Sequence, residues 1–213
     1  MDIIFFIGII TIFLFRNYVF VAIVHAMLIA LLCKHFTYKK IWIILVSYSS
    51  FVALFFLSGF LNSFLNIPAA IIKRKAEFAS LGEGNTNLLM NELQPTFKSF
   101  VFNLPQAINH FFFRPYLLEF INPAILLTAL ELFIYQLIIL LFIFFRKKHL
   151  IITNNFNVFG VILFINMMLI IGYTIPNIGA IVRYRSVFWI FILCPMVCTI
   201  NFKKMNFLKK QTA

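Results

Sequence analysis

Glu131 is the first residue whose position suggests chemistry. It lies eight residues inside an apolar run that extends from Pro123 to Phe145. At 1.5 Å per residue, a helix over this run would place the carboxyl group roughly 12 Å below the end of the run. An ionisable side chain at that depth in a membrane needs a partner or a function. Glu131 is therefore a candidate general base or proton carrier, and a neutral, hydrogen-bonded acid between helices is the alternative.

Arg183 and Arg185, separated by one residue, form the second candidate group. Guanidinium groups bind phosphate and carboxylate through paired hydrogen bonds, so the two arginines suit an anionic ligand. Arg114 and Glu119 precede the apolar run of Glu131 and are expected at the same side of the membrane. In this hypothesis the arginines hold phosphate groups, and Glu131 or Glu119 acts as general base. Contact with lipid headgroups would explain the two arginines as well.

Metal and cofactor sites are not expected. The sequence contains no phosphate-binding glycine loop, GxSxG, HExxH or CxxC motif. Cys33, Cys194 and Cys198 lie in apolar runs, without a histidine or second cysteine at metal-ligand spacing. His25 and His110 are single histidines in apolar surroundings, and we expect helix neighbours to satisfy them. The sequence therefore predicts no metal and no other cofactor.

The composition indicates that the solvent of this chain is lipid. Of its 213 residues, 63% are hydrophobic and 11% are charged, whereas soluble domains carry about 25% charged residues. A net charge of +12 would suggest nucleic acid as the partner of a soluble protein. In a membrane protein, excess lysine and arginine more often set the orientation. We therefore predict a lipid bilayer as partner and no nucleic acid.

Apolar runs near the 20 residues that a bilayer requires define the expected elements. They predict an all-α polytopic membrane protein, a single membrane domain over residues 1–213 with about six transmembrane helices. The spans are expected at residues 3–15, 18–33, 41–61, 123–145, 156–175 and 187–200. Only Arg16 and Asn17 separate the first two runs, and we prefer a hairpin there. One long helix would leave Arg16 inside the hydrocarbon, at a cost of at least ~2.5 kcal/mol.

Lysines and arginines in the connections between spans predict the orientation. If both termini are cytoplasmic, ten basic residues lie on that side, close to span ends: Lys34, Lys39, Lys40, Arg146, Lys147, Lys148, Lys203, Lys204, Lys209 and Lys210. The opposite side holds eight, five of them in a connection of about 60 residues, near the length at which the rule weakens. We therefore predict an inner (plasma) membrane protein with both termini in the cytoplasm.

Residues 62–122 form one long exoplasmic loop in this topology. The segment 71–81 could be an amphipathic helix at the membrane interface. The segment 97–113 is too interrupted by Pro105, Asn103 and Asn109 to span the membrane. We predict one or two interfacial helices along the outer surface, joined through Gly82-Glu83-Gly84-Asn85.

Three short motifs carry a resemblance to a known group of proteins. They are FRPYLLE at 113–119, ALE at 129–131 and NIGAIVRYR at 177–185. In this order they resemble poorly characterised multi-spanning proteins found with bacterial cell-surface polysaccharide genes. The resemblance covers roughly the second half of the chain. It implies a role in glycan assembly, with the positions of interest being Arg114, Glu131, Arg183, Tyr184 and Arg185.

The RYR end of the third motif also resembles the closing segment of polyprenyl-phosphate-sugar glycosyltransferases. Those enzymes carry acidic residues in their first outer loop, where this chain has only Arg16 and Asn17. The chain is also short for an oligosaccharide polymerase of the usual many-span kind.

Three classes of function stay open at this point. The first is a glycan transferase or polymerase that handles a lipid-linked sugar phosphate at the exoplasmic face. The second is a transporter or flippase for an anionic solute or lipid, with Glu131 as proton carrier. The third is a non-catalytic scaffold subunit for a membrane protein partner. A cavity that both Glu131 and Arg183 face, within about 4–6 Å of each other, would favour a functional site over a scaffold.

Overall fold

The computed structural model describes residues 8, 11–14, 16–36, 39–61, 66–80, 86–119, 123–147 and 154–202. Its helices are α2 (Asn17–His35), α3 (Lys40–Leu61), α4 (Ile67–Ser80), α5 (Phe97–Phe112), α6 (Pro123–Phe145), α7 (Asn155–Thr174) and α8 (Ile178–Thr199). Within these residues, five helices are long and apolar enough to cross a membrane: α2, α3, α6, α7 and α8. The protein is an all-α, multi-pass membrane protein, which confirms the predicted fold class.

The start of α8 differs most from the expected boundaries. The helix begins at Ile178 rather than at residue 187, and it continues through Pro195. The Asn177 side chain explains the early start, because its Oδ1 accepts a hydrogen bond from the Ala180 N–H at 3.1 Å and caps the first turn. Arg183 and Arg185 therefore lie in the helix, and their expected place in a connection between spans is wrong.

The first expected span, residues 3–15, falls mostly outside the described residues, as do Lys148, the basic residues 203–210 and the glycine-rich joint at 82–85. Arg16 is described, and its backbone is not helical, with φ −143° and ψ 61°. The chain is therefore not one unbroken helix through Arg16.

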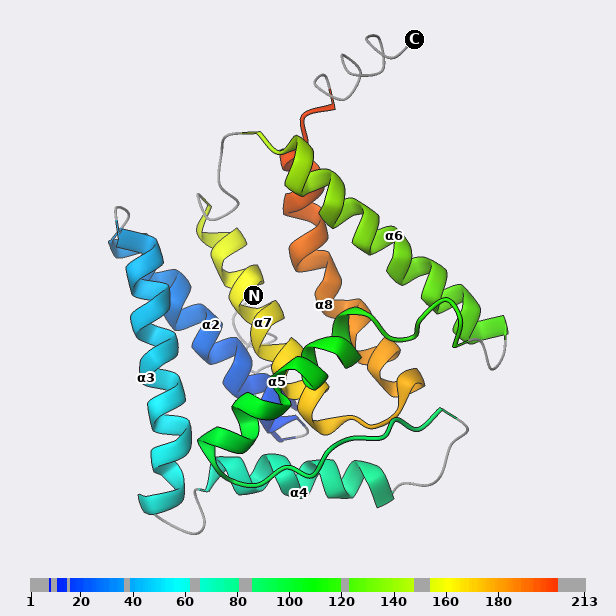
Figure 1. Cartoon of the computed structure of the whole chain (residues 1–213). Coiled ribbons are helices and arrows are strands. Elements are labelled where there is room, and N and C mark those ends of the chain that lie inside the picture. Colours follow the sequence, from blue (N-terminus) through cyan, green and yellow to red (C-terminus); the bar gives the residue numbers. More distant parts are fainter. Residues whose placement is uncertain are drawn as a thin grey trace.

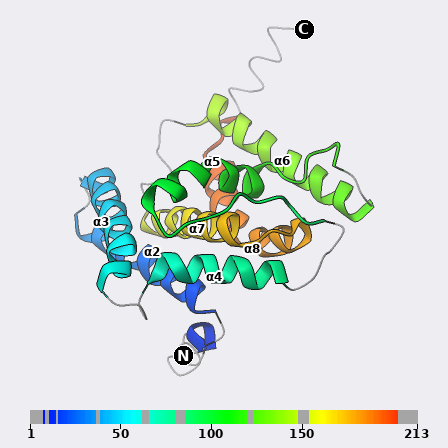
Figure 2. The ribbon, with the colours of Figure 1, turned by 60° about the horizontal axis from the view of Figure 1, so that its bottom comes forward.

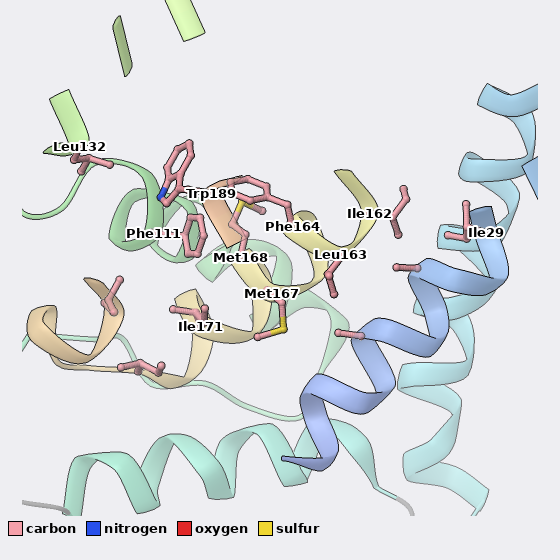
Figure 3. Packing of buried hydrophobic residues seen from close by; sticks show 14 of the residues in the cluster. Ile29, Phe111, Leu132, Ile162, Leu163, Phe164, Met167, Met168, Ile171 and Trp189 are labelled. Atoms are coloured by element: carbon pink, nitrogen blue, oxygen red, sulfur yellow. The ribbon is translucent and has the colours of Figure 1, made fainter. Parts of the chain in front are cut away.

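The five long helices stand in a row in the order α3, α2, α7, α8 and α6 (Figure 1). The central helix α7 is the most enclosed: 56% of the residues in its most apolar stretch are buried, against 6% for α3 at the edge. Its own buried side chains, among them Phe164 and Met167, belong to one apolar cluster with Phe111 of α5 and Trp189 of α8 (Figure 3). The exposed apolar faces of the outer helices fit contact with lipid.

Basic residues lie at one end of the helix bundle, the end at which α3 and α7 begin. The Lys40 Nζ atom donates to Asn155 Oδ1 at 3.1 Å, and the Lys147 N–H donates to the Thr199 carbonyl oxygen at 2.9 Å. These bonds connect the start of α3 to that of α7 and the end of α6 to that of α8. The described residues of the predicted cytoplasmic set therefore share one end. That this end faces the cytoplasm stays a prediction.

Two shorter helices, α4 and α5, lie toward the opposite end of the helix bundle. They lie on either side of α7 and α8 (Figure 2). The long loop thus contains helices, as expected, but α5 also enters the bundle. Its last residue reaches the middle of α6, where Gln136 Nε2 donates to the Phe112 carbonyl oxygen at 3.1 Å. Residues 113–119 then lead away from the interior.

Gly172 allows α5 to approach α7 closely. A Cβ atom at this position would overlap the backbone carbonyl of Ala107 in α5. Two turns away along α5, the Phe100 carbonyl oxygen accepts a hydrogen bond from the Tyr173 hydroxyl at 2.6 Å. The inner position of α5 therefore depends on a small residue and a polar one that are adjacent in α7.

Candidate functional site

Arg185 is buried against the inner end of α5, with 3% of its surface exposed. Its Nη1 atom donates to the carbonyl oxygen of Phe111 at 2.8 Å and to that of Arg114. The C-terminal end of a helix carries a partial negative charge and carbonyl groups without helical partners. Arg185 and Gln136 satisfy these carbonyls inside the bundle, where water is not at hand to do so.

Glu131 is half-buried and interacts with this group. Its Oε1 atom accepts a hydrogen bond from the Tyr135 hydroxyl, one turn further along α6. Electrostatic attraction also links Arg185 to Glu131 and Tyr135. A countercharge for a buried guanidinium thus accounts for a carboxyl group in this apolar helix.

Arg114 and Glu119 organise the segment that leads out from α5. Arg114 Nη2 lies 3.4 Å from Glu119 Oε1, and Glu119 Oε2 accepts from the Tyr116 N–H at 3.1 Å. The Tyr116 hydroxyl donates to Asn109 Oδ1 at 2.7 Å. Each of these side chains has a partner within residues 109–119, so together they fix the shape of the segment.

A separate pocket of about 500 Å³ lies between the start of α2, α4, the end of α7 and the start of α8. Most of its wall is apolar, including Val19, Phe78, Met167, Ile171, Val187 and Phe188. Its polar side chains are those of Arg16, Tyr18, Thr174, Arg183 and Tyr184, and no acidic residue is among the described residues that line it.

Two arginines share one aromatic ring at this pocket. The Arg16 Cζ atom lies 4.9 Å from the Tyr184 ring centroid and the Arg183 Cζ atom lies 5.5 Å from it. Arg16 Nη1 also donates to the Tyr18 hydroxyl at 3.1 Å. In the part of the chain that the structure describes, neither arginine forms an ion pair with a carboxylate. Among the described residues, the pocket therefore holds two positive charges and no negative one.

The structure divides the residues that the sequence suggests as one site. Arg183 and Arg185 are two positions apart, which turns their side chains roughly 200° from each other around α8. Arg183 and Tyr184 line the pocket, whereas Arg185 contacts α5. Glu131 interacts with Arg185 and does not line the pocket.

Arg16 is a site residue that the sequence reasoning missed. From the sequence, Arg16 is expected only as part of a short connection between two spans. The signal that could have found it is the same one that singled out Arg183: in the predicted topology, both are arginines on the exoplasmic side, against the usual trend.

A second buried polar group connects α2, α3 and α7. Asn166 Nδ2 lies 3.1 Å from His25 Nδ1, and Asn166 Oδ1 accepts from the Tyr48 hydroxyl at 3.1 Å. Such side chains join helices inside a membrane. One ring nitrogen of His25 is satisfied as expected, whereas the other has no hydrogen-bond partner among the described residues.

His110, near the inner end of α5, is also buried, and its Nδ1 has no partner within the described ranges. Burial, together with the positive charges of Arg114 and Lys75, lowers its pKa to about 4. The described residues contain no group of three or more His, Cys, Asp or Glu side chains suited to a metal ion.

Comparisons with known proteins return no match: no family model, no curated protein and no solved structure is significantly similar to this chain. The function must therefore be argued from the geometry of the pocket and of the buried group around Arg185.

Proposed function

We propose that this membrane protein binds a lipid-linked sugar phosphate during cell-surface glycan assembly, and that the pocket beside Tyr184 holds the lipid's phosphate end. The observation that carries this proposal is a pair of arginines at the edge of an apolar pocket, Arg16 and Arg183, which have no carboxylate partner among the residues that the structure describes. Guanidinium groups are well suited to phosphate oxygens.

The size and walls of the pocket favour an amphiphile over a free anion. Its volume of about 500 Å³ is typical of pockets for whole organic ligands. A phosphate group would fill only a small part, near the arginines. The remaining wall, which includes Val19 and Phe188, is apolar and suits a hydrocarbon chain.

The proposed role is binding and presentation of the lipid, without bond cleavage by Glu131. That carboxyl group is occupied by Tyr135 and Arg185 on the other side of α8. With both termini in the cytoplasm, as the sequence predicts, the pocket lies at the exoplasmic face. A partner enzyme in the membrane would then act on the lipid.

Movement of the lipid across the membrane is a second candidate function. The pocket wall includes Met167, seven residues before the end of α7 at Thr174. At 1.5 Å per residue, this places the inner part of the pocket roughly 10 Å along the helix. A flippase would need such an inward extension.

Complementation of a deletion strain tests the proposed role in glycan assembly. We expect Arg16→Gln and Arg183→Gln to abolish surface glycan at unchanged protein level, because each removes one guanidinium from the pocket. Arg74→Gln is the matched control, since Arg74 pairs with Glu77 on the exposed face of α4. Normal glycan in both pocket variants would contradict the proposal.

A further inference from the structure

We infer that the pocket selects lipids whose headgroup carries about two negative charges, a diphosphate or a terminal phosphomonoester, over the phosphodiester lipids of the surrounding bilayer. This inference rests on the proposed function and names the substrate class of the same site: among lipid-linked sugar phosphates, it favours those joined through a diphosphate, because a sugar joined through one phosphate is itself a phosphodiester. It follows from the number, spacing and support of the positive charges.

The two guanidinium groups come from different elements and meet at one ring. Arg16 precedes α2, whereas Arg183 lies in the second turn of α8. Because both pack against the Tyr184 ring, their Cζ atoms are at most about 10 Å apart. In the proposed complex, one headgroup contacts both arginines.

The described residues of the pocket leave this charge pair uncompensated. Its described lining contains no carboxylate, and its apolar wall screens charge poorly. A ligand with one negative charge neutralises one arginine and leaves the other. A ligand with two negative charges neutralises both and also removes the repulsion between them.

Tyr18 adds a hydrogen-bond donor to the same place. Its hydroxyl oxygen accepts a hydrogen bond from Arg16 Nη1, so its own proton is available to a ligand oxygen. Thr174 contributes less, because its hydroxyl already donates to the Ile170 carbonyl oxygen at 2.7 Å. The polar side of the pocket thus offers two cations and a neutral donor, a set that suits a group rich in acceptor oxygens.

Competition with bulk lipid makes the number of charges decisive. Phospholipids with a phosphodiester surround the exposed faces of α2 and α8 and carry one negative phosphate charge each. A phosphomonoester carries about −1.5 to −2 at neutral pH. Shape cannot exclude abundant lipids from an apolar pocket, but a site that needs two negative charges can.

Binding measurements on the purified full-length protein in detergent test the inference. The probes are farnesyl diphosphate, farnesyl monophosphate and dihexanoyl phosphatidylglycerol, with inorganic diphosphate and farnesol as the two halves of the ligand. Affinities come from native mass spectrometry and from thermal stabilisation. We expect both farnesyl phosphates to bind at least about tenfold more tightly than phosphatidylglycerol, since one more charged hydrogen-bonded contact is worth this much.

The variants assign the preference to the two arginines. Arg16→Gln and Arg183→Gln should each reduce it by about tenfold, and Arg74→Gln should leave it unchanged. Equal affinities of the wild-type protein for the farnesyl phosphates and phosphatidylglycerol would overturn the inference while the proposed function stands. A preference that survives Arg16→Gln would also overturn it. Absence of binding to every lipid probe would contradict the proposed function itself. Inorganic diphosphate that binds as tightly as farnesyl diphosphate would show a site for a free anion instead.

Discussion

The guanidinium group of Arg185 lies among backbone carbonyl oxygens of α5 and beyond it, whereas that of Arg183 is exposed at the edge of the pocket. The first position satisfies groups that lipid and protein would otherwise leave without partners. The second leaves the charge available to a ligand. The two arginines of one short motif therefore have different roles, and mutations should separate them.

Arg185→Gln should destabilise the fold by about 1–3 kcal/mol, because it leaves the carbonyl oxygens of Phe111 and Arg114 without their charged donor. Arg183→Gln should change the free energy of unfolding by no more than about 0.5 kcal/mol, as is usual for an exposed side chain. Thermal and denaturant unfolding in the same detergent compare the two variants. Equal losses of stability would contradict the division of roles.

His110 should make stability depend on pH in mild acid. Its pKa is about 4 in the folded protein, because of burial and the neighbouring charges of Arg114 and Lys75, against an ordinary value of 6.5. Between these values the unfolded chain binds the proton more readily, so the free energy of unfolding should fall as the pH is lowered from about 6.5 to 4. His110→Gln should flatten this part of the profile. Parallel profiles for the variant and the wild-type protein would refute this assignment.

Helix α5 ends inside the bundle because three residues of other helices accommodate it. Gly172 lets it approach α7, Gln136 and Arg185 bind its last carbonyls, and the segment 113–119 then leads away. A short amphipathic helix outside the membrane would need none of these contacts.

Gly172→Ala should weaken the packing of α5 on α7, since the added methyl group meets the Ala107 backbone rather than a flexible side chain. Overpacking of this kind costs about 1–3 kcal/mol. Gly8→Ala is the control, because nothing lies within 4 Å of the Cβ position at Gly8. Unfolding midpoints of the two variants measure the difference. A loss as large in the control would show that helix packing at Gly172 is not the cause.

The sequence predicts the long helices well because length and hydropathy are properties of each segment alone. The bounds of α6 are those expected, and α2, α3 and α7 begin and end within two residues of the expected positions. The inner position of α5 could not be predicted, because it depends on Gln136, Gly172 and Arg185, all distant from it in sequence. The pocket was missed for the same reason: Arg16 and Tyr184 meet only when α2 and α8 flank α7.

The orientation of the protein in the membrane can be measured from the two ends of the helix bundle. In a background without the native cysteines, we expect Glu77→Cys in α4 to react with a membrane-impermeant maleimide in intact cells. Arg146→Cys, at the end of α6, should react only after permeabilisation, because the excess of short basic connections places it in the cytoplasm. Both positions are exposed. The reverse pattern of labelling would place the pocket on the cytoplasmic side.

The backbone contact between Arg146 and Ile200 joins the ends of α6 and α8, while the other ends of these helices diverge (Figure 1). A stiff helix that is held at one end can tilt only about that end, so any change in the tilt of α6 pivots at this bridge. A small change in its tilt displaces Pro123 most and the residues beside the bridge least. Glu131 and Gln136 lie between Pro123 and the bridge. Glu131 interacts with Arg185 of α8, and Gln136 binds the end of α5. The tilt of α6 against α8 is thus set midway along α6, by these two half-buried polar side chains.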